Sequence, residues 1–293
     1  MTSRSDIVAT GDDEVLVFGA SSQIGDALLP MLGRTGIGLR AISRNPPANR
    51  PGLRWVRGGF DDIGDPPKTV ISLGPLADFS RWLGQVGGVH RIIAVGSVSL
   101  RHKSDSGAAE ERTVAAQLAE AEQLIAERSK QMDAQLTLLR PCMLYGAGRD
   151  HTVAPALRFA LDRQWLPIPS PAGGLRQPLH VADLADAISQ CLNGAGVGQT
   201  LELGGAERLR FDQLLSRIAE AVPNCQARRL PISAVRWASA IAAPWSGKLR
   251  RINRALNRAN VDQLPDETLT RQHLDWRPRQ FEPVQPGQTR AGR

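Results

Sequence analysis

Residues 15–25 read Val15-Leu16-Val17-Phe18-Gly19-Ala20-Ser21-Ser22-Gln23-Ile24-Gly25. Four apolar residues lead into Gly19, and later apolar residues recur at helical spacing, at Ile24, Leu28, Leu29 and Leu32. Strands that are buried on both faces of a parallel sheet are continuous apolar runs of this kind. The pattern therefore predicts a buried strand, a tight turn and the start of a helix.

The expected turn has the composition of a phosphate-binding turn. A glycine between strand and helix lets a pyrophosphate approach the backbone at the helix N-terminus, where free N–H groups and the helix dipole favour an anion. The glycine pattern is incomplete, because Ser22 stands in the middle position between Gly19 and Gly25. A strand–turn–helix corner without a ligand is the alternative. The candidate residues for this contact are Gly19, Ser21, Ser22, Gln23, Ile24 and Gly25.

Apolar segments alternate with helical ones along the first half of the chain. We expect strands at 38–43, 53–56, 69–73, 91–95 and 136–139, and helices at 77–86 and 108–127. This alternation predicts an α/β fold with a doubly wound parallel sheet, whose ligand lies at the carboxyl ends of the strands. Those ends hold Gly19, Arg44, Leu73, Gly74, Ser97 and Pro141, and their convergence is a stronger signal than the turn alone.

The tip of the second expected strand is Ser43-Arg44, and no acid follows it before Asp61. Folds of this type often place an acid there to bind the ribose hydroxyls of NAD. An arginine suits a 2′-phosphate instead, because its guanidinium can make two parallel charge-assisted hydrogen bonds. We therefore expect NADP(H) to be preferred, with NAD(H) as the alternative cofactor. The non-functional alternative is that Arg44 is a surface arginine that binds no ligand.

The composition is that of a globular protein. A chain of 293 residues with 42% hydrophobic and 22% charged residues fits one large domain, or a domain with a smaller lobe. No apolar run reaches the roughly 18 residues that span a bilayer. Residues 1–13 lack the apolar core of a secretory signal, so we expect a cytoplasmic protein. The three cysteines are far apart, which predicts neither a disulfide framework nor a metal site.

Positive charge is concentrated in the last quarter of the chain. Residues 228–293 contain 13 Lys+Arg and 5 Asp+Glu, whereas the net charge of the whole chain is +7. A basic lobe attracts phosphates, nucleic acid or an anionic membrane, and a solvated arginine-rich surface is the alternative. Because aromatic residues make up only 4% and no stacking motif is present, we expect a small anionic partner and no nucleic acid.

The pattern changes beyond Pro141. We expect a disordered leader at 1–12, a dinucleotide-binding domain at 13–150 to which about 178–205 returns, a mainly substrate-binding lobe at 151–282 and a loose tail at 283–293. Beyond Pro141 we expect helices at 151–162, 182–192 and 211–222, a strand at 200–203 and an extended segment at 166–171. A homodimer is one candidate for the oligomeric state, which the sequence does not reveal.

Four separated motifs occur in an order and spacing that resemble one superfamily. They are Gly19-Ala-Ser-Ser-Gln-Ile-Gly25, Arg140-Pro-Cys-Met-Leu-Tyr-Gly-Ala-Gly148, Arg176-Gln-Pro-Leu-His-Val-Ala-Asp183 and Leu274-Asp-Trp-Arg-Pro-Arg279. Together they resemble the extended short-chain dehydrogenase/reductases of the NAD(P)-dependent epimerase/dehydratase type. The resemblance implies a Rossmann-fold sheet, a small C-terminal α/β substrate lobe, and a substrate that is a nucleotide sugar or a related small molecule.

The resemblance also assigns roles to single residues. Pro141 matches the residue beside the nicotinamide, and Arg176 falls where the family often binds the diphosphate of its substrate. Ser97 matches the catalytic serine, and Ser99 is a candidate substrate contact in the same loop. His180 is a candidate for the substrate side too, although its segment mostly docks the two lobes, so a structural role is favoured.

The family's usual catalytic set is only partly present. It contains a Ser or Thr, a Tyr that exchanges a proton with the substrate, and a Lys four residues later that lowers the tyrosine pKa. The alignment that places Glu122 on the family's helix glutamate puts Val114 and Leu118 at the Tyr and Lys positions. The only tyrosine, Tyr145, belongs to another motif, and no Tyr-x-x-x-Lys occurs in the chain.

Three interpretations follow. The chain is an oxidoreductase or epimerase-like enzyme with substituted acid/base groups, for which His102 and Lys103 lie closest after Ser97. Alternatively it binds the cofactor without turnover, as a sensor or an assembly subunit. The third interpretation, a basic lobe that contacts membrane or nucleic acid, has no supporting motif. Fold analogy does not choose between the first two.

Overall fold

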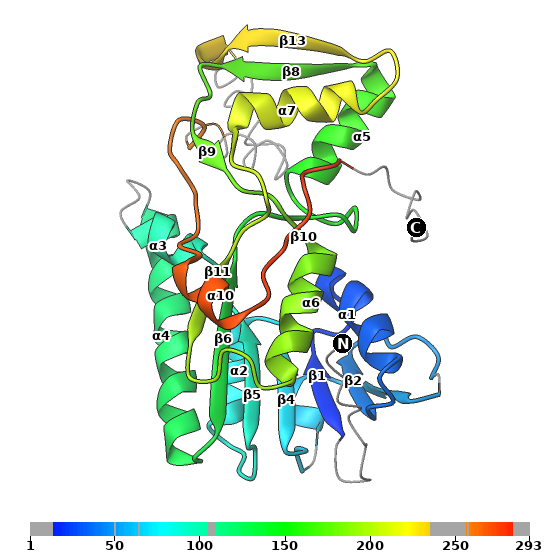
Figure 1. Ribbon diagram of the computed structural model, residues 1–293, viewed down its shortest axis with the longest axis vertical. Coiled ribbons are helices and arrows are strands. Elements are labelled where there is room, and N and C mark those ends of the chain that lie inside the picture. The colour runs from blue at the N-terminus through cyan, green and yellow to red at the C-terminus, as the bar shows by residue number, and fades with distance from the viewer. Residues whose placement is uncertain are drawn as a thin grey trace, which may run out of the picture. The chain divides into compact units, whose positions relative to one another are not determined.

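The computed structural model of the chain, shown in Figure 1, describes residues 14–49, 51–63, 65–104, 109–234, 256 and 258–283. The expected leader, the tail beyond residue 283 and most of the basic segment at 231–258 lie outside the described residues. The chain divides into two compact units. Unit 1 consists of Met1–Pro141, Val181–Leu203 and Asp266–Trp276; unit 2 consists of Cys142–His180, Gly204–Pro265 and Arg277–Arg293.

Unit 1 is organised around a seven-stranded sheet with the order β11-β6-β5-β4-β1-β2-β3, in which all neighbours are parallel. The strands are β1 (Val15–Phe18), β2 (Leu39–Ser43), β3 (Leu53–Arg57), β4 (Thr69–Ser72), β5 (Arg91–Val95), β6 (Gln135–Pro141) and β11 (Thr200–Leu203). Every residue of β1 and β5 is buried, as the continuous apolar runs predicted. The expected doubly wound parallel sheet is confirmed.

The strand order reverses between β1 and β4. The chain runs outward from β1 to β2 and β3, and then returns to place β4 on the other side of β1. In sheets of this type the ligand binds at such a reversal, at the carboxyl ends of the strands. A ligand is therefore expected at the turns that follow β1 and β4.

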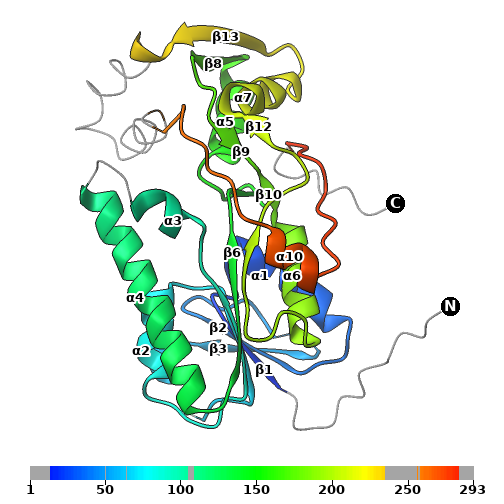
Figure 2. The ribbon, with the colours of Figure 1, turned by 60° about the vertical axis from the view of Figure 1, so that its left-hand side comes forward.

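Helices cover both faces of this sheet. Figure 2 shows α1 (Gln23–Gly33) and α6 (Val181–Leu192) on one face, and α2 (Leu76–Leu83) and α4 (Ala109–Gln131) on the other. Three shorter elements complete unit 1: the 3-10 turn η1 (Phe60–Asp62), α3 (Ser99–Ser104) after β5, and α10 (Thr268–His273) beside β11.

An aromatic cluster packs at the end of β1. Phe18, the last residue of the strand, stacks on Phe60 with ring centroids 4.4 Å apart and meets Trp82 edge-on at 4.7 Å. Phe79 lies edge-on to Phe18 at 5.8 Å and is fully buried. Offset and edge-on pairs of this kind add to the hydrophobic stabilisation of a core. The turn at Gly19 therefore begins from a rigid strand end.

Unit 2 has its own apolar core. Helices α5 (Val153–Arg163) and α7 (Phe211–Glu220) pack against β8 (Trp165–Ser170), which pairs in parallel with β13 (Gln226–Pro231). Tyr145, Ile168, Leu214 and Phe281 are among its buried residues. Two short pairs complete the described part of the unit: β7 (Leu144–Tyr145) with β10 (Leu179–His180), and β9 (Leu175–Arg176) with β12 (Leu209–Arg210).

Some elements differ from the expectations. No sequence pattern predicts β13, because this strand is exposed along almost its whole length and so lacks alternating apolar residues. α4 ends at Gln131, four residues after the expected end. α3 was not expected after Ser97. The two-residue strands of unit 2 are too short for any periodic pattern.

Candidate functional site

The turn after β1 fits closely against the end of β4. Gly19 has a positive φ of 67°, a conformation that side-chain-bearing residues rarely adopt. A Cβ at this position would lie 2.7 Å from the backbone nitrogen of Gly74 and 2.8 Å from the carbonyl carbon of Leu73. The N–H of Leu73 also donates to the carbonyl of Phe18 at 3.0 Å. The structure thus brings together Gly19, Leu73 and Gly74, and only glycine fits the first position.

Helix α1 begins with a serine cap. Ser22, which stands in place of the expected middle glycine, is the N-cap residue, and its Oγ accepts the N–H of Gly25 at 3.3 Å. A Cβ on Gly25 would lie 1.9 Å from the carbonyl oxygen of Ala20, so the helix start packs directly on the turn. The first N–H groups of a helix, here those of Gln23 and Ile24, have no acceptor within the helix.

One polar atom in this turn is buried without a partner. The side-chain amide oxygen of Gln23 has no hydrogen-bond partner within the described part of the chain. Buried polar atoms in proteins are almost always paired, so an unpaired one at a helix start indicates a missing donor. A ligand hydroxyl would supply that donor.

The tips of β2 and β3 carry hydroxyl groups and two arginines. The Ser43 hydroxyl donates to Ser21 Oγ at 3.2 Å, and its oxygen accepts the N–H of Asn45 at the same distance. Arg44 follows and is exposed. Arg57, at the end of β3, donates from Nη1 to the carbonyl of Arg44 at 3.3 Å. The sequence-based reasoning missed Arg57, because its place beside Ser43 follows from the strand register and not from any motif.

The loop after β5 is fastened to β6. Val98 donates its N–H to the carbonyl of Pro141 at 3.2 Å, which brings the expected catalytic and nicotinamide-side residues to neighbouring strand ends. Ser97 is partly exposed, and its Oγ accepts the N–H of Ser99 at 3.1 Å. Because that oxygen acts as an acceptor here, its hydrogen can still be donated to a ligand. Ser99 and His102 lie on α3, both partly exposed.

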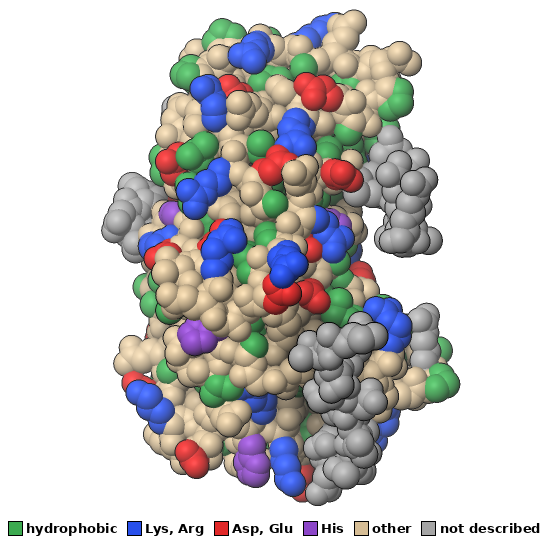
Figure 3. All heavy atoms as spheres, viewed as in Figure 1, with side chains coloured by type: hydrophobic (Ala, Val, Ile, Leu, Met, Phe, Trp, Pro, Cys, Tyr) green, Lys and Arg blue, Asp and Glu red, His purple; other side chains and the backbone are tan. Residues whose placement is uncertain are grey.

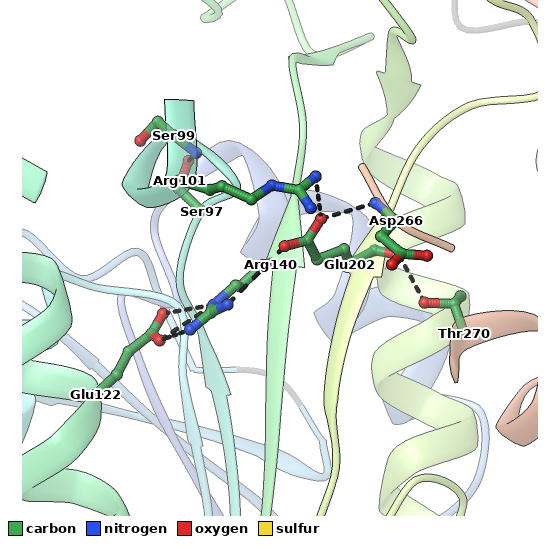
Figure 4. A network of polar contacts seen from close by, with 8 residues as sticks. All are labelled: Ser97, Ser99, Arg101, Glu122, Arg140, Glu202, Asp266 and Thr270. Carbon is green, nitrogen blue, oxygen red and sulfur yellow. Dashed lines mark hydrogen bonds and ion pairs between the residues drawn. The ribbon is translucent and has the colours of Figure 1, made fainter. Parts of the chain in front are cut away.

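A chain of alternating charges lies beneath this loop, as Figure 4 shows. Glu122 of α4 receives two donors, Nε and Nη2, from Arg140 of β6. Glu202 of β11 receives Arg101 Nη2 at 2.9 Å, and Arg140 Nη1 lies 3.9 Å from its other oxygen. Side-chain bonds to the Glu122 carboxylate raise the pKa of Arg140 further.

The same network ties a distant segment to the sheet. The N–H of Asp266 donates to Glu202 Oε2 at 2.7 Å, and the Thr270 hydroxyl donates to the Glu202 carbonyl at 2.6 Å. Arg101, a residue of α3, thus links this helix through Glu202 to the segment that contains α10 (Figure 4). The sequence analysis did not identify Arg101 or Glu202, because they are 101 residues apart and neither belongs to a motif.

The positions that resemble the family's Tyr and Lys carry apolar side chains in α4. Val114 is 41% exposed, and Leu118 packs against the apolar core of unit 1. Neither can exchange a proton. Tyr145 belongs to unit 2, where it is 1% exposed and donates its hydroxyl to the carbonyl of Gln280 at 3.2 Å. It is packed as a core residue there.

Arg176 is buried in unit 2 and binds backbone carbonyls. Its guanidinium donates to the carbonyls of Leu175 and Val261 from Nη1 and to that of Arg258 from Nη2, at 2.7–2.8 Å. It also lies 5.2 Å from the ring centroid of Phe211. Burial lowers the pKa of Arg176 to about 10, Arg258 adds to this shift and Asp262 opposes it. At neutral pH Arg176 is a cation that holds the chain around residues 258–261.

His180 lies in different surroundings within unit 2. Its imidazole fills the space that a side chain at Gly146 would take, and it meets the ring of Tyr145 edge-on at 5.1 Å. This packing is consistent with the structural role that the sequence favoured for His180. Arg176 and His180 thus have separate contacts.

Charges of both signs mix on one face of the molecule. On the face in Figure 3, Lys and Arg side chains alternate with Asp and Glu and do not form one basic field. Within the described ranges no helix is long and apolar enough to cross a membrane. The same residues contain no group of three or more His, Cys, Asp or Glu that could hold a metal ion.

Neither a protein-family model nor a curated protein matches the chain. Solved structures do match. A UDP-glucuronic acid 4-epimerase from Bacillus cereus in complex with NAD is 12% identical with a TM-score of 0.66, over 90% of this chain and 93% of that one. A UDP-glucose 4-epimerase from Thermotoga maritima with UDP-glucose is 15% identical with a TM-score of 0.64, over the same shares.

A third similar structure is MoeE5 in complex with UDP-glucose and NAD. It is 21% identical with a TM-score of 0.60, over 74% of this chain and 85% of that one. At these identities the similarity establishes the fold. The chain has a Rossmann-type α/β fold with a parallel sheet, as the alternation of strands and helices predicted.

Proposed function

We propose that the chain binds a nicotinamide dinucleotide at the carboxyl edge of the unit 1 sheet. The observation that carries this proposal is the approach of Gly19 to the backbone of Gly74 at the reversal of strand order. The packing of this turn against the end of β4 sets the N-terminus of α1 at the carboxyl edge of the sheet, where its free N–H groups can receive a pyrophosphate. The unpaired amide oxygen of Gln23 fits a ribose hydroxyl as its donor.

The proposed cofactor is NADP(H) in preference to NAD(H). Arg44 at the tip of β2 supplies a cation where NAD-binding folds often carry an acid. The buried Ser43 places its hydroxyl beside Ser21, and both lie at the strand ends where the ribose is expected. Two of the matching structures contain NAD, so the preference rests on these side chains alone.

The proposed reaction is a hydride transfer on a small hydroxyl or carbonyl compound, of which a nucleotide sugar is the first candidate. The bound dinucleotide supplies the hydride acceptor or donor. Two of the matching structures contain UDP-glucose, which motivates the choice of substrate. Pro141 would border the nicotinamide, because it ends β6 beside the loop that carries Ser97.

Ser97 is the group proposed to touch the reacting oxygen. Its hydroxyl can donate a hydrogen bond to a carbonyl, but a hydroxyl holds its proton too tightly to be an efficient acid by itself. A second group must therefore deliver the proton, and His102 on α3 is the nearest titratable candidate in sequence. Ser99 is proposed as a substrate contact in the same loop.

A second candidate function is binding without turnover. It is favoured by Val114 and Leu118, which give α4 no proton-exchanging side chain at the positions where the family has Tyr and Lys. The loss of a positioned general acid typically lowers a rate by a factor of about 10²–10⁴. A cofactor sensor or an assembly subunit would tolerate this loss.

Fluorescence titration with NADPH and NADH, followed by turnover with a panel of carbonyl compounds that includes nucleotide sugars, tests the proposal. NADPH should bind more tightly, and Arg44→Ala should weaken NADPH binding more than NADH binding. Turnover that falls in Ser97→Ala and declines as the pH rises through about 6.5 would support the enzyme with a histidine acid. Tight cofactor binding without turnover would support the second candidate, and no binding of either cofactor would contradict both.

A further inference from the structure

We propose that Arg57, at the carboxyl end of β3, is a second determinant of the preference for NADP(H), which recognises the 2′-phosphate together with Arg44. The inference rests on the proposed cofactor site, and it adds a residue that lies on a different strand. The ligand chemistry is that of a phosphate monoester dianion on a ribose.

The strand register brings the two arginines to the same edge of the sheet. Ser43 of β2 and Arg57 of β3 are direct partners in the parallel ladder. The N–H of Gly58 donates to the Ser43 carbonyl at 3.1 Å, and Arg57 Nη1 donates to the Arg44 carbonyl at 3.3 Å. The guanidinium of Arg57 therefore folds over the tip of β2. A phosphate that contacts Ser43 and Arg44 would be within reach of Arg57 as well.

Among the described residues, no carboxylate forms an ion pair with Arg57 at this corner. No Asp or Glu occurs between Ala27 and Phe60 in the sequence. The other arginines in the two strands, Arg40 and Arg54, pair with Glu14. Arg57 has a carbonyl oxygen as its acceptor and no ion pair among the described residues, and it is exposed. A guanidinium that is bonded only to a carbonyl oxygen has a positive charge that no carboxylate neutralises, and its other N–H donors can bind an anion.

Arg44 and Arg57 would both contribute to binding of the 2′-phosphate. A dianion attracts two guanidinium groups more strongly than one, and Arg57 also fixes the backbone of Arg44 through its hydrogen bond. A ribose hydroxyl, as in NAD(H), carries no charge and gains little from either. Arg57 should therefore affect the ratio of the two affinities and not cofactor binding in general.

The experiment compares Arg57→Gln with the matched control Arg54→Gln in the full-length chain, by fluorescence titration with NADPH and NADH. Both changes remove one positive charge from β3. Arg54, however, lies three residues before Arg57, and so roughly 10 Å from the strand tip, where it pairs with Glu14. We expect Arg57→Gln to weaken NADPH binding about tenfold, equivalent to about 1.4 kcal/mol, and to leave NADH binding unchanged. Arg57→Lys should keep part of the preference, and Arg54→Gln all of it.

Competition with adenosine 2′,5′-bisphosphate and with AMP gives the same information without the nicotinamide. Equal losses for NADPH and NADH in Arg57→Gln, or an equal effect of Arg54→Gln, would overturn the inference. A preference for NADPH that depends on Arg44 and not on Arg57 would overturn the inference and leave the proposed cofactor intact. Equal binding of NADPH and NADH by the unaltered chain would reject both.

Discussion

Replacing Gly25 with alanine should destabilise unit 1 and weaken cofactor binding, although alanine is normally the better helix residue. The added Cβ would lie 1.9 Å from the carbonyl oxygen of Ala20 and 2.6 Å from its carbonyl carbon. Both are backbone atoms of the turn, so they cannot swing aside as a flexible side chain would. The turn and the start of α1 must separate.

The expected size of the effect follows from two opposing contributions. Forcing extra atoms into a packed site typically costs about 1–3 kcal/mol. Alanine in a helix stabilises it over glycine by roughly 0.5–1 kcal/mol. Because an approach of 1.9 Å to a backbone oxygen lies at the severe end of the first range, the net loss of unfolding free energy for Gly25→Ala should be about 2 kcal/mol. Because the shift occurs where the pyrophosphate is proposed to lie, NADPH affinity should fall as well.

Gly33 provides the matched control in the same helix. A Cβ there would meet no atom within 4 Å, so Gly33→Ala gains the helix preference without an overlap. It should stabilise the protein by up to roughly 0.5–1 kcal/mol and leave NADPH binding unchanged. Urea unfolding followed by tryptophan fluorescence and NADPH titration would measure both variants. If Gly25→Ala were as stable as the unaltered chain and bound NADPH equally well, the reasoning about the turn would be refuted.

Three further predictions concern other parts of the chain. Burial raises the pKa of the Cys191 thiol to about 12, and Arg91 opposes this shift. Because the thiol of the unfolded chain loses its proton at lower pH than the thiol of the folded chain, the free energy of unfolding should fall between about pH 9 and pH 12, by at most about 1.4 kcal/mol per pH unit. Urea titrations of Cys191→Ala over this pH range should show a weaker decline. Glu202→Gln should lower the free energy of unfolding by about 1.5–3 kcal/mol, because it weakens the hydrogen bonds to a buried carboxylate. Arg101→Gln should lower it less, because the Arg101 side chain is half-exposed. Equal losses of the two variants in thermal unfolding would contradict this. Arg176→Lys should destabilise unit 2 by about 1–3 kcal/mol in urea, because an ammonium cannot reach the three carbonyls that the guanidinium binds; unchanged stability would show that these bonds contribute little.

The sequence predicted the sheet of unit 1 well, because buried parallel strands leave a strong pattern. The apolar runs at 15–18 and 91–95 are fully buried strands in the structure. Gly19 and Gly25 were recognised from their spacing, and the structure adds the physical reason, which is contact with backbone atoms of Gly74 and Ala20. Ser22 interrupted the glycine pattern, and the structure shows that it caps α1.

Contacts between residues that are distant in sequence could not be predicted from motifs. The place of Arg57 depends on the register of β3 against β2, which no local pattern contains. Arg176 matches a motif, but the carbonyls that it binds come partly from residues 258 and 261, more than 80 positions away. The sequence does not predict β13, because Arg228, Arg229 and their neighbours are exposed and do not alternate with apolar residues.

A crystal structure of the full chain with NADP⁺ tests the central claim, dinucleotide binding at the β1–α1 turn, most directly. We predict that the pyrophosphate lies against the N–H groups of Gln23 and Ile24. The 2′-phosphate should lie at the tips of β2 and β3, within reach of Arg44 and Arg57. A dinucleotide bound away from the turn between Gly19 and Gly25 would contradict the claim.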